Sequence, residues 1–266
     1  MTLSHEAQAH STDGAAPRRP REEVTQTLLR RHAPKKPAAP FSLAEVANRA
    51  EASLPFNMLV VSADIRNSTI VMKEASGFRL FARTLNGYLS ATRQFFQRHN
   101  GWWDKFTEDG FLCYWFYEDS PSVDQVRELT NTVLHVCRDA LDLFADRAMA
   151  DLRANSSNFP SGVGLSFGID AGRGHVVNFA GDATIVGLPV VGAVRMVSAA
   201  KTWEVVTNVH LGEHIERHLD CCFEDQLRSI RRDYRETKEY PEHQEVYSLQ
   251  FRDMGHIPES SEVGDR

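Results

Sequence analysis

The stretch at residues 99–116, HNGWWDKFTEDGFLCYWF, constrains the fold more than any other part of the chain. It is typical of two apolar strands that turn at Glu108-Asp109-Gly110, because Asp-Gly is a strong hairpin signal. A helical pattern precedes it, since apolar side chains recur at helical spacing through residues 73–98. Helices interleaved with antiparallel hairpins favour an α+β fold with the helices on one face of the sheet.

The remaining elements extend this prediction. The apolar run FNMLVVSADI at residues 56–65 is typical of a buried strand. Residues 163–181, VGLSFGIDAGRGHVVNFAG, indicate a second hairpin that turns near Gly172 to Gly174. The later elements are expected in this order: helix 122–148, loop 149–161, helix 190–201, strand 203–209, helix 210–219 and strand 245–251. Together these elements predict an antiparallel-rich central sheet with flanking helices.

The first 52 residues differ in composition from the rest of the chain. They carry little periodic apolar sequence, and prolines interrupt them at positions 17, 20, 34, 37 and 40. Such a composition does not offset the entropy lost on ordering. We therefore expect residues 1–52 to be a flexible, Pro- and Arg-containing extension, residues 53–250 to form one folded domain, and residues 251–266 to be a C-terminal tail.

Composition argues against several classes of protein. Lys plus Arg number 30 and Asp plus Glu 36, giving a net charge of −6, so the chain lacks the basic footprint of a general nucleic-acid binder. Its apolar stretches fall well short of the ~20 residues that span a bilayer, and its N-terminus has no secretory-signal pattern. The four cysteines form no CxxC pair and are expected to be reduced thiols. The expectation is a cytoplasmic protein without a membrane span.

Two carboxylates are the strongest candidates for chemistry. Asp64 closes an apolar strand and Asp109 lies at a hairpin tip, so adjacent strand ends can bring both side chains to one point. Two close carboxylates repel unless a cation lies between them, and oxygen ligands of this kind suit Mg²⁺ or Mn²⁺ together with a substrate phosphate. The alternative is structural: a helix N-cap aspartate and a turn aspartate.

Asn67, Ser68 and Thr69 follow Asp64 and open a predicted helix. The start of a helix offers free backbone N–H groups and the positive end of the helix dipole, which together bind phosphate. The same three residues are also ordinary helix caps. A carboxylate, a capped helix start and a second carboxylate together indicate metal-assisted phosphoryl chemistry more strongly than any one of them alone.

Four sequence blocks then follow one another in order: VVSADIRNST, WWDKFTEDGFLCYW, VGLSFGIDAGRGHVV and ATIVGLPVVGAVRMVSAA. Together they resemble the catalytic domain of the class III nucleotide cyclases, the adenylate and guanylate cyclase family. The resemblance covers about residues 54–250, and DKFTEDGFLCYW is its most specific block. It implies an α+β fold of the palm or ferredoxin-like type that works as a head-to-tail homodimer.

The resemblance also implies roles for individual residues. Asp64 and Asp109, assisted by the Ile65 carbonyl, would bind two divalent cations, Mn²⁺ or Mg²⁺, and the substrate would be a nucleoside triphosphate whose 3′-hydroxyl attacks the α-phosphorus. Lys105 and Thr184 match the base-binding positions. Arg195 matches the family's transition-state arginine, which suits the charge that develops on phosphate oxygens. These last three residues would come from the subunit opposite the metal site.

The chain departs from the family pattern at three positions. Val191 stands where the family usually has a ribose-orienting Asn, Leu188 replaces the usual Asp nearby, and Glu108 replaces the Gly before the metal-binding Asp. These changes leave a slower enzyme, a different ribose contact or an inactive homologue open. Lys105 and Arg195 also remain open to interpretation as solvated charges, and Thr184 as a plain loop threonine.

The WWDKF block and the short N-terminal extension resemble the bacterial pyrimidine cyclases of the Pycsar anti-phage systems. That resemblance implies UTP or CTP as substrate, cyclic UMP or cyclic CMP as product, and a separate effector protein that senses the product. A Lys/Thr pair at the base positions is also compatible with adenine. Two alternatives therefore remain: an adenylate or guanylate cyclase in ordinary signalling, and a non-catalytic dimerisation module.

Overall fold

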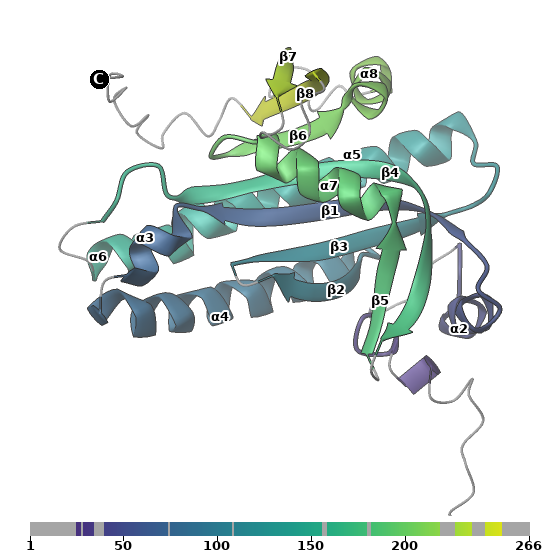
Figure 1. The fold of residues 1–266 in the computed structure, drawn as a ribbon, viewed down its shortest axis with the longest axis horizontal. Helices are drawn as coiled ribbons and strands as arrows, with labels where there is room; N and C mark the ends of the chain where they lie inside the picture. Colours follow the sequence, from purple (N-terminus) through teal and green to yellow (C-terminus); the bar gives the residue numbers. More distant parts are fainter. Residues whose placement is uncertain are drawn as a thin grey trace, which may run out of the picture.

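The computed structural model describes residues 25–27, 29–34, 40–73, 75–107, 109–155, 159–179, 182–218, 227–235 and 243–251 (Figure 1). At its centre is an eight-stranded mixed sheet with the order β2-β3-β1-β4-β6-β8-β7, in which β5 pairs with β4. The neighbouring strands are antiparallel except β4 and β6, which are parallel. The strands are β1 (Phe56–Arg66), β2 (Trp102–Thr107), β3 (Gly110–Tyr117), β4 (Gly164–Phe179), β5 (Asp182–Gly187), β6 (Glu204–Asn208), β7 (Leu227–Arg235) and β8 (His243–Phe251).

Two long helices cover one face of the sheet. They are α4 (Ala75–Arg98) and α5 (Val123–Leu143), and a π-helical stretch (Phe144–Met149) joins α5 to α6 (Ala150–Ala154). A capping box fixes the start of α5, since the Ser122 and Gln125 side chains bond each other's backbone N–H. Apolar side chains from these helices and from odd positions of β1 and β4 form the larger hydrophobic core.

A shorter layer covers part of the opposite face, so the prediction of helices on one face was wrong. It contains α7 (Leu188–Ala199) and α2 (Leu43–Glu51), and Figure 1 shows α7 crossing in front of β1 and β4. A Cβ on Gly168 of β4 would lie 2.1 Å from the α7 backbone. Glycine is therefore required at this crossing, and it allows α7 to lie directly on the sheet.

The predicted turn at Gly172 to Gly174 does not exist. β4 runs unbroken for 16 residues and pairs along its length with β1 and then β5. Gly174 serves close packing instead of a turn, because a Cβ at this position would lie 2.9 Å from the Val186 carbonyl. The chain reverses after Phe179, which is why β5 was missed by the sequence analysis.

The other predicted elements agree with the structure apart from their ends. The hairpin of β2 and β3, the helices α4, α5 and α7, the strands β6 and β8, and α8 (Val209–His218) are confirmed. The helix predicted to open at residues 67–69 is the short α3 (Ser68–Lys73), separate from α4. β7 was not predicted, and a loop was expected where α6 continues the α5 stretch. No helix of the described residues is long and apolar enough to cross a membrane. Cys113 and Cys137 are buried free thiols, whereas Cys221 and Cys222 lie outside the described residues.

Part of the predicted flexible extension is packed against the domain. Leu29 is fully buried and belongs to a core cluster with Val46 and Ala47 of α2. His32 lies against the edge strand β2, where its carbonyl accepts from the Trp103 N–H at 2.9 Å. Its ring Nδ1 is 2.6 Å from the Trp103 carbonyl oxygen. The described residues before position 53 therefore protect a sheet edge, which the proline content does not reveal.

Candidate functional site

Asp64 and Asp109 lie at the same end of the central sheet. Asp64 is near the end of β1 and pairs with Gly110 of β3, so Asp109 directly precedes its cross-strand neighbour. Even positions of β1, such as Met58 and Val60, point away from the core formed by α4 and α5. Asp64 shares that parity, so its carboxyl group lies on the α7 side of the sheet.

The negatively charged Asp109 is one of the groups that affect the ionisation of Asp64. Burial raises the pKa of Asp64, the nearby Arg66 guanidinium lowers it, and the negative charge of Asp109 raises it. The fold therefore brings together two acidic groups that are about 45 positions apart in the sequence. A cation bound between them would relieve their repulsion.

The first residue of α3 contacts the carboxylate pair. The Ser68 hydroxyl, on a buried residue, donates a hydrogen bond to the Asp109 carboxylate. Asn67 has a left-handed backbone, with φ of 58°, and its side-chain amide donates to the Ser161 and Gly162 carbonyls. Thr69 is exposed. Ser68 is thus part of the carboxylate cluster, whereas the Asn67 side chain anchors a neighbouring loop.

Arg66 is a member of the cluster to which sequence reasoning gave no role. Its Nη1 lies 3.3 Å from Asp64 Oδ2, and its Nε donates to Ser166 Oγ at 3.0 Å. Ser166 is the residue of β4 that pairs with Asp64 of β1. The alternation of side chains along a strand could have identified Arg66 as a neighbour of Asp64, because residues 64 and 66 project from the same face of the sheet.

The oxygen atoms gathered here fit a hard divalent cation. Asp64 and Asp109 supply carboxylates, whereas the Ile65 side chain is buried in the helix-side core, so only the backbone of Ile65 is available for such a role. Within the described ranges, no three or more His, Cys, Asp or Glu side chains group together as a metal site. Mg²⁺ bound by one or two carboxylates commonly completes its shell with water and phosphate oxygens.

A second polar pair lies where β5 meets β2. The Thr184 hydroxyl donates to Asp104 Oδ2 at 2.9 Å, and both side chains are buried. Lys105 follows Asp104 in β2, and its side chain lies outside the described residues. The two predicted base-binding positions, 105 and 184, thus lie on β2 and β5 of one chain, two strands that contact each other without pairing.

Arg195 lies on α7 beside a separate open pocket of about 430 Å³, which also contains Asp170, Asn208 and His210. Burial raises the pKa of Asp170 to about 6, against hydrogen bonds from the Ala171 N–H and the Asn208 amide that lower it. Asp64 and Asp109 are not among the described residues that line this pocket. Arg195 thus lines a pocket that is made by α7, β4, β6, α8 and β8.

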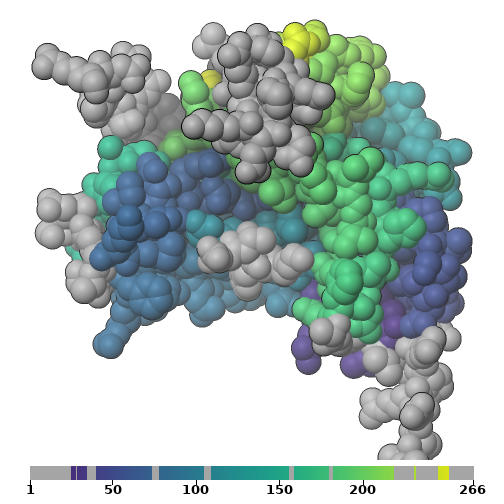
Figure 2. Space-filling model, viewed as in Figure 1, coloured from purple at the N-terminus to yellow at the C-terminus, as the bar shows by residue number. Residues whose placement is uncertain are grey.

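The exposed face of α7 carries Leu188 and Val191, at positions where class III cyclases usually have Asp and Asn. Leu188 is 83% exposed and Val191 47%. Val194 on the same helix and Phe179 at the end of β4 are also exposed. Figure 2 shows α7 and β5, in green, at the molecular surface. An apolar patch of this kind marks a protein contact surface more often than a solvated one.

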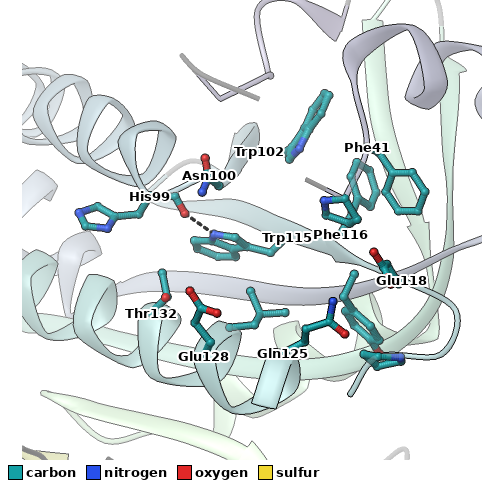
Figure 3. Close-up of a pocket in the computed structure, with 14 residues that line it drawn as sticks. Phe41, His99, Asn100, Trp102, Trp115, Phe116, Glu118, Gln125, Glu128 and Thr132 are labelled. Carbon is teal, nitrogen blue, oxygen red and sulfur yellow. Dashed lines mark hydrogen bonds between the residues drawn. The ribbon is translucent and has the colours of Figure 1, made fainter. Parts of the chain in front are cut away.

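A further cavity of about 330 Å³ lies at the far end of β3 from Asp109. Aromatic side chains from β2 and β3, including Trp102 and Trp115, form one wall, and Gln125 and Glu128 of α5 lie opposite (Figure 3). The Trp115 indole N–H donates to the His99 carbonyl at 2.8 Å. The length of β3 separates this cavity from the carboxylate pair, so it is not part of that site.

Comparison with solved structures gives a consistent result. The adenylyl cyclase CyaB from P. aeruginosa matches 76% of this chain and 98% of its own, with 21% identity and a TM-score of 0.56. The guanylate cyclase domain of RhGC from Catenaria anguillulae, solved in complex with GTP, matches 74% of this chain and 97% of its own, with 15% identity and a TM-score of 0.53. The protein has the class III nucleotide cyclase fold.

The guanylyl cyclase Cya2 shows the same likeness, covering 77% of this chain and 98% of its own, with 14% identity and a TM-score of 0.52. No protein-family model matches the sequence, and no curated protein does. The predicted fold is therefore confirmed by the likeness to solved structures.

Proposed function

We propose that this protein is a metal-dependent nucleotide cyclase, which converts a nucleoside triphosphate to its 3′,5′-cyclic monophosphate and pyrophosphate. The observation that carries the proposal is the meeting of Asp64 and Asp109 at one end of a sheet that has the class III cyclase fold. Two facing carboxylates on such a scaffold suit the binding of cations that accompany a triphosphate.

In this proposal Asp64, Asp109 and the Ile65 carbonyl hold two divalent cations, Mn²⁺ or Mg²⁺. Bound cations of this kind lower the pKa of a hydroxyl nucleophile and neutralise phosphate charge. Ser68 orients the Asp109 carboxylate through its hydrogen bond. The backbone at Asn67, Ser68 and Thr69 lies beside the triphosphate. The side chains of the protein position the substrate and neutralise its charge. The 3′-hydroxyl attacks the α-phosphorus directly, so no covalent enzyme intermediate is required.

The proposed active form is a head-to-tail homodimer in which each site is shared. Lys105 and Thr184 recognise the base, and Arg195 stabilises charge on the phosphate oxygens, all three from the subunit opposite the carboxylate pair. Two features support this arrangement: Arg195 lines a pocket to which, among the described residues, neither Asp64 nor Asp109 contributes, and the exposed side chains of α7 near it are apolar. Dimerisation through α7 would cover Leu188 and Val191 and bring Arg195 to the partner.

For the base we favour UTP or CTP, with the cyclic product acting on a separate sensing effector in anti-phage defence and with the enzyme in the cytoplasm. The WWDKF block supports this choice. A purine substrate is the second candidate, and it is favoured by the structural neighbours, which are named adenylyl and guanylyl cyclases. The folded unit at residues 53–250 would carry the activity, together with the packed residues before it.

A four-nucleotide panel tests the proposal. Purified protein is incubated with Mn²⁺ and each of ATP, GTP, CTP and UTP, and products are identified by mass spectrometry. A cyclic monophosphate from one or two of them is expected, and Asp64→Ala and Asp109→Ala should abolish it while circular dichroism shows an intact fold. No cyclic product from any of the four would favour the non-catalytic dimerisation module instead.

A further inference from the structure

We propose that Arg66 is an exchangeable counter-ion of the carboxylate site: it neutralises Asp64 when no cation is bound, competes with the first cation for Asp64, and transfers to the triphosphate when the site is loaded. The cation and phosphate parts of this inference rest on the proposed function. The ion pair itself is independent of it, since it involves only residues of one strand and its neighbour.

The geometry places Arg66 where a cation would lie. Its Nη1 is 3.3 Å from Asp64 Oδ2, and both side chains retain partial exposure, 25% and 30%. A guanidinium and a metal ion cannot both bind the same carboxylate oxygen at short range without repelling each other. Entry of a cation at Asp64 therefore requires Arg66 to withdraw from this oxygen.

The bonds that hold Arg66 in place are few. Nε donates to Ser166 Oγ at 3.0 Å, while Nη2 is buried without a hydrogen-bond partner in the part of the chain that the structure describes. An unsatisfied buried donor is unfavourable, so the ion pair with Asp64 is the main interaction that keeps the guanidinium here. Once a cation occupies Asp64, that interaction is lost and the side chain favours a new anionic partner.

The triphosphate of the proposed substrate is the nearest such partner. Its oxygens would bind the same cations as Asp64 and Asp109, and Arg66 directly precedes the start of α3 at Asn67 and Ser68. A planar guanidinium with several N–H groups binds phosphate oxygens in a bidentate manner. Transfer of Arg66 from carboxylate to phosphate would favour uptake of the cation together with the nucleotide over uptake of the free cation.

The test measures Mn²⁺ binding in the absence of nucleotide, by electron paramagnetic resonance of free Mn²⁺. Arg66→Gln should bind Mn²⁺ roughly two- to fivefold more tightly than the wild type, because a partly exposed competing ion pair is removed. Arg66→Lys keeps the charge and should stay near the wild type. Arg127→Gln removes the same charge from an exposed pair with Asp124 on α5 and should change nothing.

An unchanged or weaker Mn²⁺ affinity in Arg66→Gln would overturn the competition, as would absence of Mn²⁺ binding by both the wild type and this variant. If Arg66→Gln does not fold, Ser166→Ala loosens the guanidinium and should also tighten Mn²⁺ binding, to a smaller degree. These binding results do not depend on turnover, so they remain interpretable if the nucleotide panel yields no cyclic product.

The proposed contact between Arg66 and the triphosphate is tested by a separate measurement. With fluorescent analogues of the four nucleoside triphosphates in saturating Mn²⁺, Arg66→Gln should weaken binding by roughly tenfold, as expected for loss of charge-assisted hydrogen bonds. Tighter Mn²⁺ binding together with weaker nucleotide binding is the signature of exchange. Tighter binding of both would show that Arg66 competes with the cation but does not contact phosphate.

Discussion

The Thr184 hydroxyl donates its hydrogen to the buried carboxylate of Asp104, 2.9 Å away. This bond joins β5 to β2, and it uses the only donor that the Thr184 side chain has. Thr184 therefore presents oxygen lone pairs, and no second O–H, to any other group that approaches it. The Asp104 carboxylate in turn depends on this bond for part of its stabilisation, because it is 4% exposed.

Thr184→Val should destabilise the fold by about 1–3 kcal/mol, because it leaves a buried acceptor without its hydroxyl partner at nearly constant side-chain volume. Thr184→Ser keeps the hydroxyl and should lose less than half of that. Urea unfolding followed by circular dichroism measures both. Equal stability of the Val variant and the wild type would show that the bond makes no net contribution.

The sequence predicted the carboxylate site better than its surroundings. Asp64 and Asp109 stand at strand ends next to clear turn and helix signals, and local pattern is sufficient to place such residues. The contacts of Arg66 and Asp104 depend on which strands are neighbours and in what register. Register is set by long-range pairing, so a single sequence does not reveal that Ser166 faces Asp64 or that Thr184 reaches Asp104.

β4 shows why part of the fold was mispredicted. Gly172 and Gly174 are typical of a turn, yet both lie in an extended strand, which β5 approaches closely at Gly174. Glycine serves both purposes, and only the packing partner distinguishes them. The packing of Leu29 and α2 was missed for a related reason, since their apolar residues are too sparse to outweigh the surrounding prolines.

Asp170→Asn should change how stability depends on pH. The folded protein holds the Asp170 pKa at about 6, above the ordinary value of 3.8, mainly because the group is buried. A raised carboxyl pKa stabilises the protonated folded state, and that contribution is present below about pH 4 and is lost as pH rises through about 6. The Asn variant, which does not ionise, should therefore be more stable than the wild type at pH 7.5, by on the order of 2 kcal/mol.

Unfolding in urea at a series of pH values between 4 and 7.5 provides the measurement for Asp170. The advantage of the Asn variant should shrink as pH falls, since the wild-type carboxyl becomes protonated. Parallel stability curves for the two proteins would contradict the raised pKa.

Gly192→Ala should disturb the contact between α7 and β4. A Cβ at this position would lie 1.7 Å from Asp170 Oδ2, so either the carboxyl group or the helix must move. We expect a loss of about 1–3 kcal/mol from overpacking, although alanine is intrinsically the better helix former. Because Arg195 is one turn further along α7, the proposed cyclase activity should fall as well.

Two further variants isolate this effect. Asp170→Ala combined with Gly192→Ala should recover most of the lost stability, since the clashing group is gone. Gly87→Ala on α4, where no atom lies within 4 Å of the new Cβ, should stabilise the protein by about 0.5–1 kcal/mol. A Gly192→Ala variant as stable as Gly87→Ala would mean that α7 packs less closely than the structure indicates.

Mixing two inactive variants tests whether sites are shared between subunits. Asp64→Ala removes the carboxylate half of a site, and Arg195→Ala removes the α7 half. If these halves come from different chains, a heterodimer contains one site with both halves intact and one with neither. Random mixing of subunits gives half heterodimers, so activity should return to about a quarter of the wild-type level.

The matched control mixes Asp64→Ala with Asp109→Ala. Both changes lie in the same half of the site, so each site of that heterodimer lacks one carboxylate and the mixture should stay inactive. Heterodimer formation is verified with two affinity tags in both experiments. No activity from the Asp64→Ala and Arg195→Ala mixture would place the carboxylates and Arg195 in the same subunit's site, and the exposed apolar face of α7 would then need a different partner. Recovery in the Asp64→Ala and Asp109→Ala mixture would instead show that the two carboxylates of one site come from different subunits.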